Sequence, residues 1–149
     1  MPMKILVING PNLNMLGRRD AAHYGTDTLP AIERALAEKG KSLGCKLGFF
    51  QSNHEGAIID FIQANTDEAD GILINPTALT HYGYSLHDAL VDSGLPVVEV
   101  HLSDIQNREE WRKISVISDI ALKQISGLKT QSYILGLEAL VEHIKGEKK

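Results

Sequence analysis

Short apolar segments alternate along the chain with stretches in which apolar residues recur every three or four positions. The short segments at 5–8, 45–51, 71–74 and 96–101 are typical of buried strands. The periodic stretches predict amphipathic helices over 28–43, 55–62, 85–93 and 130–145. This alternation predicts a doubly wound α/β fold, with about five strands in a parallel sheet and right-handed crossovers.

Local signals predict where several elements begin and end. Thr28, with Pro30 in the first turn, indicates a helix start, and Gly44 indicates its end. Residues 52–55 have the spacing of a capping box. Residues 108–113 are predicted to be helical, and strand character is expected near 121–125. Since no repeat or linker is visible, residues 1–149 are predicted to form one domain.

Polar residues follow three of the predicted strands. The first connection runs from residue 9 to about residue 27, whereas most such connections have about 2–6 residues. Polar stretches also follow the third strand, at 75–84, and the fourth, at 101–112. The carboxyl ends of parallel strands meet at one edge of a sheet, where open α/β folds bind ligands. The sequence therefore predicts a site at this edge.

Composition narrows the classes of function. The net charge of −4 argues against general nucleic-acid binding, which favours a basic face. Cys45 is the sole cysteine, so neither an internal disulfide nor a cysteine metal cluster can form, and the histidine spacing predicts no metal site. The segment Met1–Ile5 resembles neither a signal peptide nor a membrane span, which favours a cytoplasmic location.

Two pairs of residues carry candidate chemistry. Glu99 and His101 lie two apart on the fourth strand and point to one face. A carboxylate beside an imidazole favours the charged form, which makes His101 a candidate general acid; a purely structural pair is the alternative. Arg108 and Arg112 lie four apart on a predicted helix, where they are able to bind a carboxylate. The glutamates at 109–110 are equally compatible with a solvated face.

Other candidates have plainer alternatives. The segment 75–81 is rich in hydrogen-bonding groups, but a turn that caps the next helix explains it as well. Asp88 lies three residues after Ser85, a spacing that favours helix-start capping. The long first connection holds Asn12 and Tyr24, and it is also compatible with an ordinary polar surface loop.

Several motifs together resemble the type II 3-dehydroquinate dehydratases, or type II dehydroquinases. Residues 10–25 resemble the family segment Gly-Pro-Asn-Leu-Asn-x-Leu-Gly-x-Arg with Tyr-Gly shortly behind. Residues 51–56, 75–81 and 99–112 resemble later motifs in the same order and spacing. The resemblance covers nearly the whole chain, and it implies a flavodoxin-like three-layer fold with a five-stranded parallel sheet.

The resemblance also implies an activity. Family members dehydrate 3-dehydroquinate to 3-dehydroshikimate by anti elimination through an enolate, without metal or cofactor, in the shikimate pathway. It further implies a homo-oligomer, a dodecamer built from trimers. Composition and the first residues add the expectation of no nucleic-acid or membrane partner.

Roles for individual residues follow from the same resemblance. Tyr24 is implied as the base, acting as tyrosinate. Because tyrosine ordinarily has a pKa of about 10, ionisation at pH 7 costs about 4 kcal/mol, so a cation must assist. Arg19 is that cation by family spacing, with Arg18 as the alternative. His101 is the acid, oriented by Glu99. The further implied residues are Asn12, which holds a water or the enolate oxygen, and Asn75, His81, Asp88, Leu102, Ser103 and Arg112, which bind substrate, Asp88 in a neighbouring subunit's site.

The departures from the family pattern remove no group implied to be catalytic. Asp20-Ala21 stands where the family usually has Glu-Pro, between Arg19 and Tyr24. Asp104, His87 and Ser132 replace a common Asn, Arg and Gly respectively.

Two other classes of protein share the predicted fold. A flavin-binding module would need a Ser/Thr-rich phosphate cradle, which the first connection lacks. A receiver-type signalling domain would need an acidic cluster at the end of the central strand, where Asn75-Pro76 stands instead. A lysine Schiff-base route to the same product is disfavoured because the lysines lie mainly in predicted helices and near residue 149.

Overall fold

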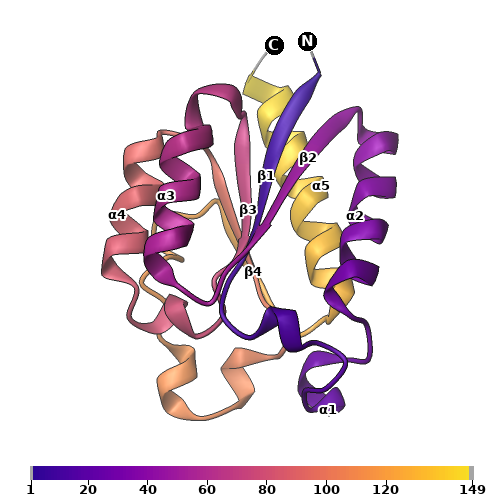
Figure 1. Cartoon of the computed structure of the whole chain (residues 1–149), viewed down its shortest axis with the longest axis vertical. Helices are drawn as coiled ribbons and strands as arrows, with labels where there is room; N and C mark the ends of the chain where they lie inside the picture. Colours follow the sequence, from indigo (N-terminus) through magenta and orange to yellow (C-terminus); the bar gives the residue numbers. More distant parts are fainter. Residues whose placement is uncertain (1, 148–149) are drawn as a thin grey trace.

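A computed structural model describes residues 2–147 as five parallel strands wrapped by helices (Figure 1). The sheet order is β2-β1-β3-β4-β5. The strands are β1 (Met3–Asn9), β2 (Cys45–Gln51), β3 (Gly71–Asn75), β4 (Val97–Val100) and β5 (Lys123–Ile125). The predicted flavodoxin-like α/β fold with a five-stranded parallel sheet is confirmed.

Helices cover both faces of the sheet. In Figure 1, α3 (Glu55–Asn65) and α4 (Tyr84–Ser93) lie on one side, and α2 (Leu29–Leu43) and α5 (Thr130–Glu147) lie on the other. Shorter elements form the connections: α1 (Ala21–Tyr24) and the 3-10 turns η1 (Leu13–Met15), η2 (Thr66–Glu68), η3 (Thr77–His81), η4 (Ile105–Asn107) and η5 (Glu110–Lys113).

The apolar run of β1 explains why helices cover both faces. Ile5 and Val7 join the buried cluster beneath α2 and α5, whereas Leu6 and Ile8 join the cluster beneath α3 and α4. Successive side chains of a strand point to opposite faces, so a continuous apolar run needs cover on both. Each such fully buried side chain contributes roughly 1.5–3 kcal/mol.

Helix α2 has the predicted ends. The Thr28 side chain accepts a hydrogen bond from the Ala31 amide at 3.3 Å, and Pro30 lies in the first turn. Gly44 adopts a left-handed conformation at φ 75°, which ends the helix without the strain that a side chain would add there.

The predicted capping box at residues 52–55 is wrong. Helix α3 begins at Glu55, and its cap residue His54 makes no side-chain capping bond. The Ser52 hydroxyl instead accepts from the His54 amide, and the Glu55 carboxylate accepts from the amide of Leu86 in α4, both at 3.0 Å. A partner distant in sequence therefore satisfies one of the free amides that every helix start presents.

The prediction that Ser85 and Asp88 cap the start of a helix is also wrong. Helix α4 begins at Tyr84, with Gly83 as a cap residue that makes no side-chain bond. Ser85 and Asp88 therefore lie inside the helix.

The predicted helix over 108–113 is confirmed only for residues 110–113, which form the 3-10 turn η5. Arg108 has an extended backbone between η4 and η5, so Arg108 and Arg112 do not share a helix face. The Asp104 side chain accepts from the Gln106 backbone amide, so the separate turn η4 begins at Ile105, before the predicted helix. Arg108 follows that turn, and its side chain bonds to Tyr24. The strand expected near 121–125 is present as β5.

The connections after β1 and β3 pack directly on each other at the carboxyl edge of the sheet. The Gly10 amide donates to the Asn75 carbonyl at 2.8 Å, and a Cβ atom on Gly10 would lie 2.6 Å from the Pro76 carbonyl oxygen. A side chain at position 10 would therefore push the two connections apart.

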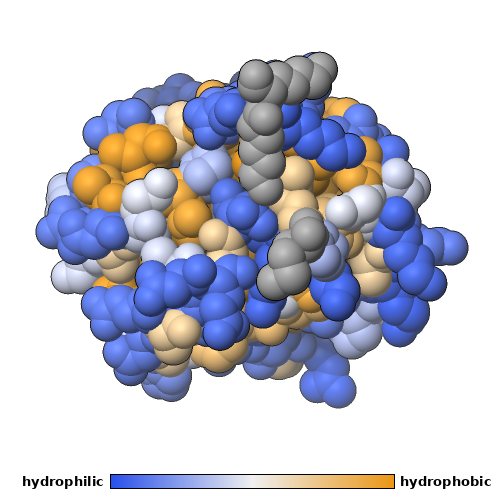
Figure 2. Space-filling view, turned by 90° about the horizontal axis from the view of Figure 1, so that it is seen from above, coloured by the Kyte–Doolittle hydropathy of each residue, from blue (hydrophilic) through white to orange (hydrophobic). Residues whose placement is uncertain are grey.

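The opposite end of the molecule carries the start of β1 and the end of α5. Figure 2 shows this end, where hydrophilic residues surround smaller hydrophobic patches. Among residues 2–147, no helix combines the length and apolar character needed to cross a membrane.

Gly10→Ala should lower the free energy of unfolding by about 1–3 kcal/mol, because the new methyl group meets backbone that cannot rotate away. Urea unfolding measures this. Gly56→Ala is the matched control, since a Cβ there meets nothing within 4 Å. Equal stability of the two variants would contradict the close approach.

Candidate active site

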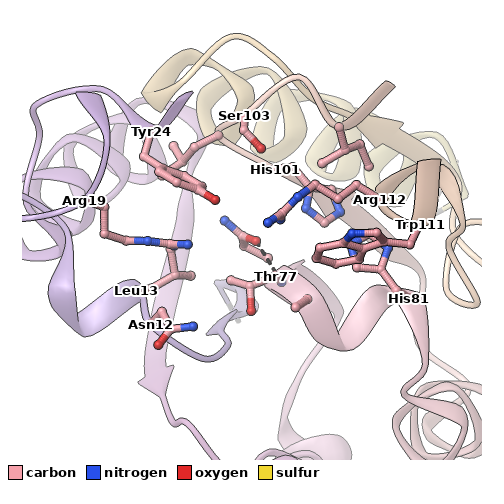
Figure 3. A pocket seen from close by; sticks show the side chains of 14 residues that line it. Asn12, Leu13, Arg19, Tyr24, Thr77, His81, His101, Ser103, Trp111 and Arg112 are labelled. Carbon is pink, nitrogen blue, oxygen red and sulfur yellow. Dashed lines mark hydrogen bonds between the residues drawn. The ribbon is translucent and has the colours of Figure 1, made fainter. Parts of the chain in front are cut away.

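A pocket opens at the carboxyl edge of the sheet and encloses about 580 Å³, part of it open solvent. Figure 3 shows Arg19 and Tyr24 on one wall and His81, Trp111 and Arg112 on the opposite wall. The structure brings nine of the predicted residues to the lining: Asn12, Arg19, Tyr24, Asn75, His81, His101, Leu102, Ser103 and Arg112.

Tyr24 lies between two guanidinium groups. The central carbon of Arg19 lies 3.7 Å from the centre of the tyrosine ring, and Nη1 of Arg108 donates to the Tyr24 oxygen at 2.8 Å. Asp20 caps α1 by accepting from the Ala22 backbone amide at 2.9 Å, which starts the turn that carries the tyrosine. Asp20, a departure from the family pattern, thus begins the single helical turn that ends at Tyr24.

The sequence analysis named Arg108 as a candidate carboxylate ligand but missed its contact with Tyr24. Its side chain is only 10% exposed, and besides Tyr24 it contacts the Ser103 hydroxyl at 3.3 Å. The neighbouring acidic residues indicated a solvated helix face, whereas the extended backbone turns Arg108 inward. The family motif includes an arginine at this position, but neither the motif nor the spacing from Arg112 indicated a contact with Tyr24.

The pocket is strongly cationic. Burial lowers the pKa of Arg19; the charge of Tyr24 acts in the opposite direction, and the like charges of Arg108 and Arg112 lower it further. Arginine nevertheless keeps its proton in proteins. Arg19 and Arg112 line the pocket and Arg108 contacts its Tyr24, and these three guanidinium groups favour an anionic ligand.

Glu99 and His101 form a buried hydrogen-bonded pair. Nε2 of His101 lies 2.5 Å from Oε2 of Glu99, which leaves Nδ1 as the ring nitrogen available to the pocket. Burial acts to raise the pKa of Glu99, but hydrogen bonds from His101, Thr80 and Gln124 outweigh it and leave the pKa below its usual value. Glu99 is therefore a carboxylate that fixes both the tautomer and the orientation of His101.

His81 and Arg112 lie together on the opposite wall. Nδ1 of His81 is 2.6 Å from the Ile114 carbonyl, so that nitrogen carries a proton, and burial lowers the pKa of the ring. The His81 ring packs edge-on against Trp111, with 5.1 Å between the ring centres. Arg112 lies over Trp111 at 4.2 Å and donates to Glu109 at 2.9 Å, so its guanidinium is held at the pocket.

The motif at residues 51–53 supports Asn12. The backbone amide of Asn12 donates to Oδ1 of Asn53 at 2.9 Å, and the side chain of Gln51 donates to the Gly10 carbonyl at 3.2 Å. These bonds hold Asn12 at φ 73°, a left-handed conformation that asparagine tolerates better than most residues.

Leu102 and Ser103 line the pocket as predicted, but the adjacent helix start is only the 3-10 turn η4. Asp88 is placed elsewhere. It lies on α4 with a side chain that is 79% exposed, contacts His87 at 3.1 Å, and does not line the pocket of its own chain. Within residues 2–147, no group of three or more His, Cys, Asp or Glu side chains is arranged to hold a metal ion.

The fold and the site together define a small α/β enzyme with proton-transfer groups around a cationic pocket. A family model described as Dehydroquinase class II matches residues 3–141. The 3-dehydroquinate dehydratase of Roseiflexus castenholzii is 54% identical over 139 residues, 93% of this chain and 88% of that protein. That of Halothermothrix orenii is 50% identical over 142 residues, 95% and 96% of the two chains.

Solved structures agree. The type II dehydroquinase from Butyrivibrio crossotus superposes with a TM-score of 0.90 at 45% identity, over 93% of this chain and 97% of that one. The type II dehydroquinase from Propionibacterium acnes superposes with a TM-score of 0.90 at 39% identity, over 95% of this chain and 98% of that one. The chain therefore belongs to the class II dehydroquinase family and is an enzyme of the lyase type.

Glu99→Gln should remove a pH-dependent part of the stability. Because the folded pKa of Glu99 lies below its ordinary value of 4.5, the unfolded chain binds more protons near that pH. The stability from the carboxylate is therefore present above about pH 4.5 and is lost as the pH falls through the folded pKa. We expect a loss of about 1–3 kcal/mol at pH 7 that narrows in acid.

Urea unfolding of both proteins from neutral to acidic pH measures the effect. Glu110→Gln is the control, because its exposed carboxylate pairs only with Lys113 at the surface, and such pairs contribute little. A Glu99→Gln deficit that stayed constant across this pH range would contradict the argument.

Proposed function

We propose that the protein is a 3-dehydroquinate dehydratase that performs an anti elimination of water through an enolate. The observation that carries the proposal is the pairing of groups in one pocket. Tyr24 has one guanidinium group stacked over its ring and another bonded to its oxygen, and a histidine oriented by a buried carboxylate serves as the acid. The dehydratase names of the relatives support the substrate.

Tyr24 acts as the base. Arg19 and Arg108 stabilise the phenolate form electrostatically, and that oxygen takes the proton from the carbon next to the substrate ketone. The electron pair of the broken C–H bond moves into the enolate, whose oxygen is held by Asn12 directly or through a water.

His101 acts as the acid in the second step. The enolate re-forms the ketone and expels the hydroxyl from the neighbouring carbon, and His101 gives that hydroxyl the proton it needs to leave as water. Glu99 stabilises the charged imidazolium before this transfer and holds the ring in place.

The remaining lining residues hold the substrate. Its carboxylate binds near Leu102 and Ser103, where the pocket is cationic, and its ring hydroxyls bind Asn75, His81 and Arg112. The chemistry needs no metal or cofactor, and we place the reaction in the cytoplasm as part of the shikimate pathway.

Purified, chelator-treated protein should convert 3-dehydroquinate into a product with the ultraviolet absorbance of a conjugated enone. No rise in absorbance would overturn the proposed function.

Tyr24→Phe should nearly abolish turnover, because the variant lacks the basic oxygen, while substrate still binds. Isothermal titration with 3-dehydroquinate measures the binding, and exchange of the proton next to the ketone into deuterated water measures the first step. We expect both exchange and dehydration to be lost.

His101→Ala is the matched comparison. It should lose dehydration while keeping much of the proton exchange, because the base and the enolate site are intact. Near-normal turnover by Tyr24→Phe, or equal losses of both steps in His101→Ala, would contradict the assigned roles.

We also propose that the protein is a homo-oligomer in which Asp88 enters a neighbouring chain's pocket. Tyr84, Asp88 and Val91 recur at helical spacing on one face of α4, and Tyr84 and Val91 are exposed apolar residues. An interface would bury them beside the carboxylate. The trimer-based dodecamer implied by the family is the expected assembly.

Light scattering should therefore give a mass well above that of one 16.3 kDa chain. Asp88→Asn should raise the KM while the assembly persists. A single-chain mass at assay concentration, or an unchanged KM, would contradict this part of the proposal.

A further inference from the structure

A buried series of hydrogen bonds connects Asn75 to Tyr133 and Asn9. The Tyr133 hydroxyl, on α5, donates to Oδ1 of Asn9 at 2.6 Å and accepts from Nδ2 of Asn75 at 3.0 Å. All three side chains are at most 2% exposed. Asn9 and Asn75 are neighbours in register on β1 and β3, so α5 joins the ends of two central strands through one hydroxyl.

A backbone amide sets the direction of every bond in this series. The Thr77 amide can only donate, and it donates to Oδ1 of Asn75 at 3.1 Å. Asn75 must therefore present Nδ2 to Tyr133, and the Tyr133 oxygen must accept from it. The Tyr133 proton is then directed to Asn9. Burial raises the pKa of Tyr133, so the hydroxyl keeps that proton.

Close packing of α5 holds the tyrosine at this depth. Gly136 lies one turn beyond Tyr133 on the same helix face, and a Cβ atom there would lie 2.6 Å from Cγ1 of Val100. The helix therefore lies close against the sheet, and the Tyr133 ring is fully buried within the apolar cluster.

We propose that Tyr133 is a positioning residue that acts through Asn75. Its hydroxyl holds the Asn75 amide with Oδ1 toward the backbone, so that the second N–H of Nδ2 serves the pocket. The site therefore recognises an acceptor oxygen of the substrate at this point. This inference rests on the proposed function, because it concerns the binding of 3-dehydroquinate.

Tyr133→Phe tests the proposal, since it removes only the hydroxyl. Without that acceptor the Asn75 side chain is held by the Thr77 amide alone, so the Nδ2 donor that serves the pocket is less firmly placed, which should raise the KM about tenfold while kcat changes much less. A merely structural role would reduce the amount of active enzyme without changing the KM. Ile144→Val is the matched control: it trims a buried α5 side chain that packs beside Gly71, at the far end of β3, and its KM should equal that of the parent protein.

A double-mutant comparison tests whether the effect passes through Asn75. Adding Tyr133→Phe to Asn75→Ala should leave the KM of Asn75→Ala unchanged, because the group that Tyr133 orients is already absent. A second tenfold rise would overturn the proposed route.

Asn9→Leu covers the case in which Tyr133→Phe does not fold. Removing the acceptor at the far end frees the Tyr133 proton to turn toward Asn75, so the KM should rise here too. If the parent protein turns over 3-dehydroquinate and the folded variants have an unchanged KM, the positioning role is overturned but the proposed function is not. A parent protein with no turnover would overturn the proposed function and this inference with it.

Discussion

The phenol of Tyr24 must lie where two guanidinium groups contact it, one over the ring and one at the oxygen, and much of the molecule serves that requirement. Arg19 and Tyr24 come from the connection after β1, whereas Arg108 comes from the connection after β4. β1 and β4 do not adjoin each other, because β3 lies between them. Only a parallel sheet, in which all carboxyl ends meet at one edge, brings these connections together without a long detour.

Buried polar groups on the other side of the pocket follow the same logic. A carboxylate with no exposed surface, such as Glu99, is tolerated only when hydrogen bonds replace its lost hydration. Thr80, Ser115 and Gln124 supply those bonds from three different segments. The proposed acid, His101, is thus held by a network anchored in the core, while the proposed base, Tyr24, is held by charges at the rim. Buried hydrogen bonds therefore hold the His101 side of the site, whereas contacts with arginine side chains hold the Tyr24 side.

The sequence predicts the sheet well and the side-chain contacts poorly, for a physical reason. Apolar runs such as 5–8 and the cap at Thr28 act locally, so the strands and α2 appear where expected. Polar residues after three of the strands predict the site edge because parallel topology leaves few alternatives. The Glu55 bond to α4 and the inward turn of Arg108 depend on partners far along the chain. Tyr133 and Asn9 lie 124 positions apart, a pairing that no local pattern contains.

The helix α1 shows how the two halves of the site depend on each other. Four residues make one helical turn, and an isolated turn is unstable because nucleation is costly. The Asp20 cap offsets part of that cost, but it acts at the first residues of the turn, whereas Tyr24 is the last. The tyrosine therefore depends for its position on contacts across the pocket, chiefly the bond from Arg108. Arg108 in turn is oriented by Ser103, next to the strand that carries Glu99. The groups that stabilise the base are thus the same groups that place it, so a change that removes the charge of Arg108 also removes the contact that orders Tyr24.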